Sequence, residues 1–262
     1  MKHIWTVALL LVVAGCSKHS GSVPANTAST VSPGAAPEFV ILEYDPWRML
    51  VGSDSPTFAL YANREVISRA QSGYRSAVLS VPQYEGLQSE LDTVARFSKF
   101  EETYILTAAT DQVLTRVLSF ESGESSGVDV YGSLRVEELR QHAPRSLISM
   151  FDVATNFENS QSEEWVPEFI EVMIWPYKYA SGASITWPPG WPQLDDPNTR
   201  QIRQRREVAY SIYLPGKHLA ELKALLEQKK TPGAFEIGGK KWALNYRFPF
   251  PGESRWMQAS TK

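Results

Sequence analysis

The segment Gly123–Gly127 has the spacing G-x-S-x-G with Ser125 at its centre, which is the arrangement of a serine nucleophile in many hydrolases. That chemistry requires a strand before the serine and a helix after it, so that the hydroxyl stands exposed on a tight turn. The residues that follow, 128–131, alternate as a strand does and predict a hairpin loop instead. The serine would also need a base such as His142, whose polar neighbours favour a solvated position.

The rest of the sequence gives little support for a catalytic metal site or for a glycosidase site with two carboxylates. From residue 38 onward the histidines are His142 and His218, whereas a catalytic zinc site takes three protein ligands that usually include histidine. Adjacent carboxylates occur at 101–102, 163–164 and 195–196, but a glycosidase needs two that face each other across a sugar ring. The sequence predicts no cofactor and no metal, and it favours a protein that is not an enzyme.

Aromatic residues are concentrated between positions 165 and 191, which hold four of the eight tryptophans. Two interpretations stay open. The rings can fill a core and brace a proline-rich loop, or some can be exposed as a docking surface, since exposed Trp and Tyr bring large contact area with few rotatable bonds. Four arginines follow closely and could meet an acidic partner, or they could be a solvated charge run. The candidate binding residues within 175–206 are Trp175, Tyr177, Tyr179, Trp187, Trp191, Arg200, Arg203, Arg205 and Arg206.

The first fifteen residues predict an export signal. Lys2 precedes a nearly continuous apolar run, Ile4–Ala14, which is shorter than the ~20 residues that a membrane-spanning helix needs. The segment Val13–Cys16 resembles the lipobox of bacterial lipoproteins. That resemblance implies cleavage before Cys16 and attachment of fatty acyl chains to it, and Cys16 is the chain's single cysteine. By the sorting rule of that family, Ser17 implies the outer membrane, with the body facing the periplasm.

Residues 17–37 predict a flexible tether, because sixteen of the twenty-one are Ser, Thr, Gly, Ala or Pro and no apolar periodicity is present. Such a segment has an r.m.s. reach of roughly 25 Å. The domain organisation expected is therefore a signal peptide at 1–15, a lipidated cysteine and tether at 16–37, and a single globular body at 38–262. That body carries 24 Lys and Arg against 29 Asp and Glu, and this acidic balance argues against a nucleic-acid partner.

The body is predicted to be α+β, with a largely antiparallel sheet built from hairpins and a few segregated helices. Asn63-Arg64 and Gly238-Gly239 are expected to be hairpin turns, and Pro144 is expected to begin the main part of a helix. The strands are expected at 38–44, 56–62, 65–69, 75–81, 104–108, 113–120, 127–131, 169–177, 207–214, 235–237 and 241–247, and the helices at 82–97, 134–156 and 219–230.

Segments 56–62, 109–112 and 129–132, with the Trp-Pro pairs after them, resemble secreted bacterial domains of uncharacterised activity. The expected function is a non-catalytic binding or interaction domain, anchored to the envelope membrane by lipid and meeting a protein or another envelope component. An immunity- or inhibitor-like role is a specific version of this hypothesis. The alternatives are a structural component of envelope assembly and an envelope hydrolase that uses Ser125.

Overall fold

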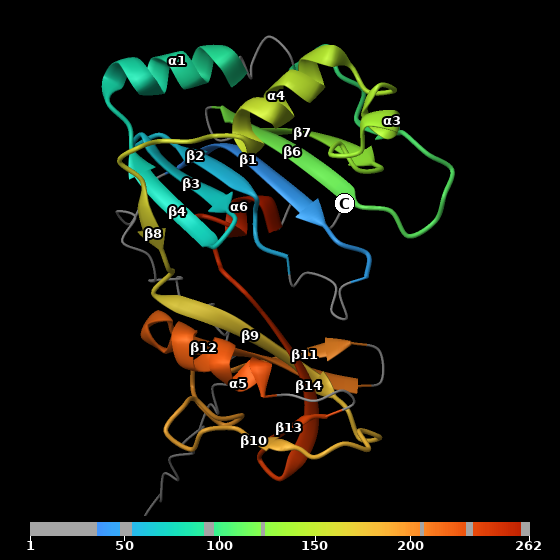
Figure 1. Cartoon of the computed structure of the whole chain (residues 1–262), viewed down its shortest axis with the longest axis vertical. Coiled ribbons are helices and arrows are strands. Elements are labelled where there is room, and N and C mark those ends of the chain that lie inside the picture. The colour runs from blue at the N-terminus through green and yellow to red at the C-terminus, as the bar shows by residue number, and fades with distance from the viewer. Residues whose placement is uncertain are drawn as a thin grey trace, which may run out of the picture.

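The computed structural model describes residues 36–47, 54–91, 97–121, 124–204, 207–228 and 233–257. Within them the fold is α+β, with an eight-stranded and a six-stranded sheet, both mostly antiparallel, and five short helices (Figure 1). This confirms the predicted fold class. The predicted export signal, Cys16 and the predicted tether up to residue 35 lie outside the described residues. Among the helices that are described, none is long and apolar enough to cross a membrane.

The first sheet has the strand order β5-β7-β6-β1-β2-β3-β4-β8, and each neighbouring pair is antiparallel except β5 with β7. The turn between β2 and β3 contains Arg64 in a left-handed conformation, with φ of 69°, as the predicted hairpin requires. The strands are β1 (Pro37–Tyr44), β2 (Phe58–Tyr61), β3 (Glu65–Ala70), β4 (Gly73–Val78), β5 (Thr103–Ile105), β6 (Leu114–Glu121), β7 (Glu124–Tyr131) and β8 (Glu163–Trp165).

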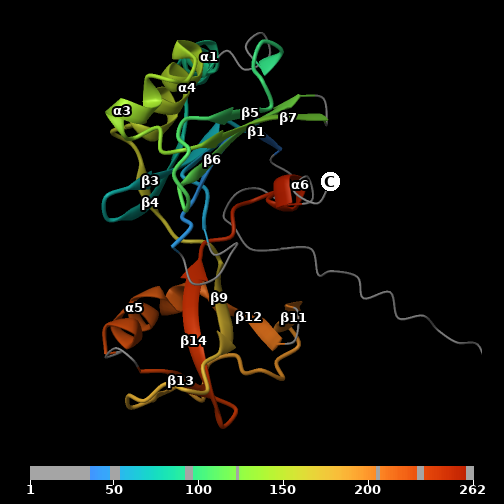
Figure 2. The same cartoon turned by 90° about the vertical axis from the view of Figure 1, so that its right-hand side faces the viewer.

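Helices cover one face of this sheet (Figure 2). They are α1 (Val81–Leu91), α3 (Glu137–Arg140) and α4 (Arg145–Thr155). Helix α4 begins directly after Pro144, as predicted, and buries Leu147, Met150, Phe151 and Ala154, whose spacing places them on one side of a helix. These side chains form a hydrophobic cluster with residues of α1 and of strands β1, β2 and β6.

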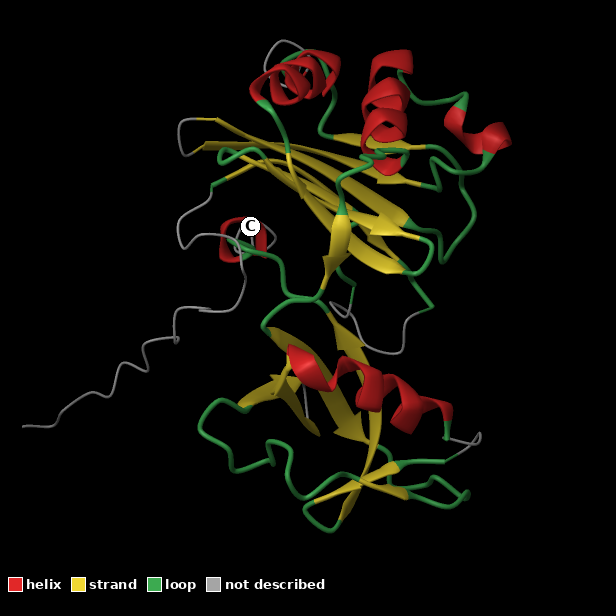
Figure 3. Ribbon diagram, turned by 60° about the vertical axis from the view of Figure 1, so that its left-hand side comes forward, coloured by secondary structure: helices red, strands yellow, loops and turns green. Residues whose placement is uncertain are grey.

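The second sheet has the order β10-β13-β14-β9-β12-β11, and only β10 and β13 are parallel among its described pairs. Helix α5 (Leu219–Glu227) follows a short 3₁₀ turn, η1 (Gly216–His218), and its buried Leu219 and Leu222 pack in the same cluster as this sheet (Figure 3). The strands are β9 (Phe169–Pro176), β10 (Ile185–Thr186), β11 (Arg200–Gln204), β12 (Glu207–Pro215), β13 (Phe235–Ile237) and β14 (Lys240–Arg247).

After β14 the chain returns to the first sheet, and its last described element is α6 (Ser254–Met257), on the face opposite α1 and α4 (Figure 2). The Tyr61 hydroxyl donates to the Pro251 carbonyl at 3.1 Å, and the ring of Trp256 lies 6.1 Å from that of Phe120. One buried cluster contains residues of both sheets, including Tyr74 of β4 and Phe250 of the returning segment. The two sheets therefore share a core.

A buried group of charges joins the returning segment to the second sheet. The Arg247 guanidinium donates to Glu171 at 2.7 Å and to both oxygens of Glu253 at 2.8 Å. Ser211 Oγ donates to Glu171 at 2.6 Å, and the Phe250 N–H donates to Glu253 at 3.2 Å. Two carboxylates around one cation hold the pKa of Arg247 well above its usual range despite burial. We call Arg247, Glu171 and Glu253 the buried triad.

Most predicted elements are present with shifted ends. The region 134–156 is two helices rather than one, because Pro144 separates α3 from α4. The helix expected to reach residue 97 is described only to Leu91, and 92–96 lie outside the described residues. The sequence prediction missed β8, β10, β11 and α6, which are short or rich in polar residues and carry no clear hydrophobic period.

Candidate functional site

The predicted docking surface at 175–206 contains two tryptophans that are not exposed. Trp187 and Trp191 are 2% and 7% exposed, and their rings meet edge to face with centroids 4.8 Å apart. Trp187 Nε1 donates to the Pro192 carbonyl at 3.0 Å, and the ring of His218 lies 5.5 Å from that of Trp191. The docking interpretation is therefore wrong for these two rings, since they brace the proline-rich loop from inside the core.

The other predicted binding residues lie in different settings. Trp175, in β9, and Tyr177 are half-buried, whereas Tyr179 is 93% exposed. The Arg200 guanidinium lies 5.2 Å above the ring of Tyr213. Burial and the nearby Glu171 raise the pKa of Tyr213 to about 12, although Arg200 and Arg247 oppose the shift.

Three of the predicted arginines lie partly or wholly outside the described residues. Arg203 lies in β11, paired with Val208, but its side chain is outside the description, and Arg205 and Arg206 lie outside the described residues altogether. What remains of the predicted surface is one exposed ring, Tyr179, and one arginine that rests on an aromatic ring.

Ser125 does not lie on a strand-to-helix turn. It is an exposed residue of β7, paired with Phe120 of β6 in an antiparallel hairpin. His142 is exposed after α3, and its N–H donates to the Leu139 carbonyl at 3.0 Å. The expected hairpin is present, but Ser125 lies in its second strand and not in its loop. A serine within a strand lacks the strand-to-helix turn on which a hydrolase nucleophile stands.

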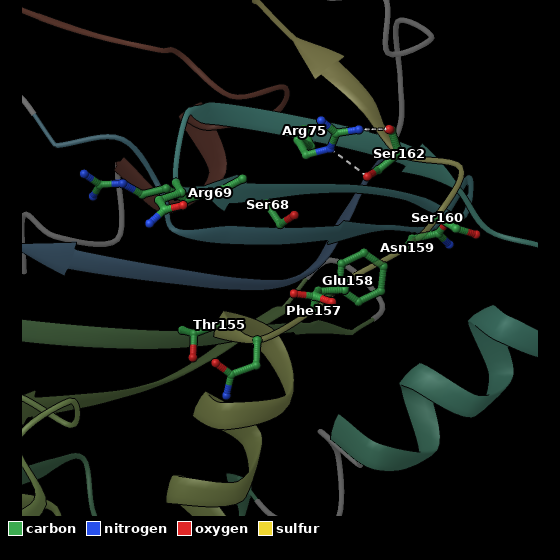
Figure 4. Close-up of a pocket in the computed structure, with 12 residues that line it drawn as sticks. Ser68, Arg69, Arg75, Thr155, Phe157, Glu158, Asn159, Ser160 and Ser162 are labelled. Carbon is green, nitrogen blue, oxygen red and sulfur yellow. Dashed lines mark hydrogen bonds between the residues drawn. The ribbon is translucent and has the colours of Figure 1, made fainter.

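A groove of about 800 Å³ lies beside strand β3, at the end of α4. Figure 4 shows β3 and β4 on one side of it, and the end of α4 with the loop that follows on the other. The lining residues are Ser68, Arg69, Ala70, Gln71, Arg75, Thr155, Asn156, Phe157, Glu158, Asn159, Ser160 and Ser162. We call this hollow the polar groove, because hydroxyl and amide side chains dominate its wall.

The loop side of the polar groove is anchored at two points. The ring of Phe157 packs edge to face on Phe58 of the sheet, with centroids 5.8 Å apart. Arg75 Nε donates to Ser162 Oγ at 2.8 Å, and the same guanidinium also bonds the Ser162 carbonyl (Figure 4). The loop is thus held against β2 at its beginning and against β4 at its end, which fixes the width of the groove.

Several polar side chains in the groove have unused hydrogen-bonding capacity. Within the described part of the chain, Ser68, Gln71, Asn156 and Ser160 make no side-chain hydrogen bond. Each offers a donor and an acceptor to whatever enters the groove. Glu158 is the one carboxylate among the lining residues, so the wall holds no pair of acids and no serine beside a histidine. The arrangement suits recognition by hydrogen bonds.

A second hollow of about 560 Å³ continues from the groove past Arg69, Gln71 and Thr155. Its charges are already paired in part, because Glu43 accepts two hydrogen bonds from Arg135, at 2.7 and 2.8 Å, and one from Thr57 at 2.8 Å. These bonds hold the pKa of Arg135 above its usual range. Among the described residues, no group of three His, Cys, Asp or Glu is placed to hold a metal ion.

Sequence reasoning missed the polar groove. The available signal was the run Thr155–Ser162, in which hydroxyl and amide residues are dense directly after an amphipathic helix. The run alone does not say that β3 and β4 lie opposite, about ninety residues earlier in the chain. No protein-family model, curated protein or solved structure matches the chain.

Proposed function

We propose that the chain is a lipid-anchored protein of the bacterial cell envelope whose folded body is a non-catalytic binding domain. The observation that carries this proposal is the polar groove, where unpaired hydroxyl and amide side chains from two distant segments line a hollow of about 800 Å³. Ligand sites are concave and use a few convergent polar groups for specificity. The partner we propose is a protein of the envelope, because an extended peptide offers the backbone donors and acceptors that such a wall can pair.

The lipid anchor is the second part of the proposal and depends on the lipobox at Val13–Cys16. A single acyl chain binds a membrane only marginally, whereas two or more give stable attachment. The tether would then let the body reach roughly 25 Å from the membrane. Ser17 supports the outer membrane as the destination, with the body in the periplasm.

Site-specific photo-crosslinking in the native bacterium tests the binding role. A photoreactive residue at Asn156 or Ser160 should give the same discrete adduct, because both line the groove. Ser126, exposed on the β7 hairpin, and Ser181, exposed in the loop after β9, are matched control positions. Absence of an adduct at the groove positions, or an identical adduct at all four, would contradict the groove as the binding site.

The identity of the crosslinked protein also distinguishes an inhibitor- or immunity-like role from a structural one. Loss of its activity when this chain is bound supports an inhibitor- or immunity-like protein, whereas adducts with several outer-membrane assembly proteins favour the structural alternative.

Two substitutions test the lipid anchor. Cys16→Ser should leave an unlipidated precursor, detected by mass spectrometry. Ser17→Asp should move the lipidated protein to the inner membrane in density-gradient fractions. Unchanged membrane retention of Cys16→Ser would refute the anchor.

A further inference from the structure

A third hollow, of about 360 Å³, lies between the two sheets and shares Arg69, Ala70 and Gln71 with the polar groove. The tip of the β3–β4 hairpin forms one side, and β14 with α5 forms the other. Its lining residues are Ser55, Arg69, Ala70, Gln71, Ser72, Gly73, Tyr74, Lys223, Asn245, Tyr246, Arg247 and Phe248. Three of these are cationic and none is a carboxylate. We call it the intersheet pocket.

The three cations in the intersheet pocket differ in whether their charge is already paired with a carboxylate. The charge of Arg247 is used by Glu171 and Glu253 in the buried triad. Arg69 and Lys223 are exposed, and neither has an ion-pair or side-chain hydrogen-bonding partner within the described part of the chain. Arg69 belongs to β3 of the first sheet, and Lys223 belongs to α5, the helix that packs on the second sheet. The pocket thus brings together two free positive charges that the sequence keeps about 150 residues apart.

The intersheet pocket is also lined by uncharged side chains that can donate hydrogen bonds. Ser55 Oγ accepts the Phe248 N–H at 2.7 Å, which leaves the hydroxyl hydrogen of Ser55 free to donate. Gln71 and Ser72, at the exposed hairpin tip, add an amide and a second hydroxyl. A guanidinium, an ammonium and hydroxyl donors around one hollow are the groups that bind oxyanions, and the guanidinium can bond two oxygens at once.

We propose that the intersheet pocket binds a phosphate monoester through Arg69 and Lys223. A phosphate monoester carries a charge of about −1.5 to −2 at neutral pH, which matches two free cations better than a single carboxylate does. The volume is at the lower end of the ~300–1,000 Å³ of small-molecule sites, so it suits a short ester such as a glycerol or sugar phosphate. The phosphate can belong to a soluble metabolite or to a lipid headgroup.

Titration calorimetry on the full-length chain in neutral detergent micelles tests the proposal with two probes. One is glycerol 3-phosphate, with glycerol as its uncharged counterpart. The other is phosphatidic acid doped into the micelles, with phosphatidylcholine as its counterpart. Saturable binding of either monoester, weaker at higher ionic strength and absent for the counterparts, supports the pocket. Binding of the lipid alone identifies a headgroup as the source, and binding of glycerol 3-phosphate identifies a soluble ester.

Charge-removing variants assign the binding to this pocket. Arg69→Gln and Lys223→Gln should each weaken binding by about tenfold or more, since each removes a charge-assisted hydrogen bond. The controls are Arg145→Gln and Lys240→Gln, which remove exposed cations outside the pocket and should leave affinity unchanged. All four positions are exposed, so the unfolding temperature should not move. No saturable binding of either monoester, or equal losses in the pocket and control variants, would overturn the proposal. The crosslinking test of the polar groove uses other residues and succeeds or fails independently.

Discussion

Replacement of Arg247 with methionine should be among the most damaging single changes to this fold. Arg247 is 7% exposed and makes four charge-assisted contacts with Glu171 and Glu253. Methionine keeps much of the volume but removes the cation. Glu171, 5% exposed, and Glu253 would then face each other as carboxylates with only the Ser211 hydroxyl and the Phe250 N–H to compensate.

The loss of stability expected for Arg247→Met depends on the burial of the charges that remain. Removing one partner of a buried charge pair costs about 3–5 kcal/mol, because the remaining charge is left desolvated and unpaired. At about 2–4 °C per kcal/mol for a chain of this size, Arg247→Met should lower the unfolding temperature by roughly 6–20 °C. The triple variant Arg247→Met, Glu171→Gln, Glu253→Gln should recover most of this loss, because it leaves no charge in the buried triad.

Urea unfolding of an unlipidated form that begins at Ser17 measures the loss of free energy, and thermal unfolding of the same form measures the loss of unfolding temperature. The matched control is Arg135→Met, which also breaks a two-bond guanidinium–carboxylate pair, but one whose arginine side chain is 51% exposed. Its partner Glu43 is 14% exposed and keeps the hydrogen bond from Thr57, so this variant should lose less stability than Arg247→Met does. Equal losses for Arg247→Met and Arg135→Met, or a triple variant as unstable as the single one, would refute the reasoning from burial.

Three further changes test other parts of the fold by the same measurement. Burial raises the pKa of the Glu65 carboxyl in the folded protein above its pKa in the unfolded chain. Ionised Glu65 therefore lowers the stability of the fold at pH values above the raised pKa, and Glu65 has no such effect at pH values below the pKa in the unfolded chain. Glu65→Gln should therefore stabilise the fold at about pH 7.5 and not at about pH 3.5, and an equal effect at both would contradict this. Gly216→Ala should cost about 1–3 kcal/mol, since a Cβ there would overlap a backbone carbonyl, whereas Gly190→Ala, with open space around it, should be silent. Trp191→Ala should lower the free energy of unfolding by about 3–5 kcal/mol, because Trp191 is buried. The control Tyr179→Ala removes an exposed ring and should lower it by less than about 0.5 kcal/mol. Similar losses for the two variants would mean that the loop is not packed as described.

Local chemistry explains which elements could be predicted from sequence. The hairpin of β13 and β14 turns at Gly238 and Gly239, whose φ angles of 57° and 70° require residues that tolerate the left-handed region. Helix α4 followed from its apolar spacing and from Pro144. Strand β11 was missed because an arginine-rich run shows no period of two, and it becomes a strand only by pairing with β12.

The polar groove could not be predicted in the same way. Its two sides, β3–β4 and the loop 155–162, meet because β4 pairs with β8, and because Phe157 packs on Phe58 and Arg75 bonds Ser162. Each of these contacts joins residues far apart in the chain. Periodicity and turn chemistry report only on neighbours, so the run of hydroxyl and amide residues after α4 was visible while its function was not.

The sequence by itself determined the fold class, most hairpins and the placement of the main helices, since these depend on backbone preferences and apolar spacing over a few residues. It also carries the segment Val13–Cys16, from whose resemblance to a lipobox we predict a lipid anchor. Only the tertiary structure decided that Trp187 and Trp191 belong to the core, that Ser125 lies in a strand, and that Arg69 and Lys223 face one pocket. Burial and convergence are properties of the packed chain, because they arise when distant segments exclude water from the same volume.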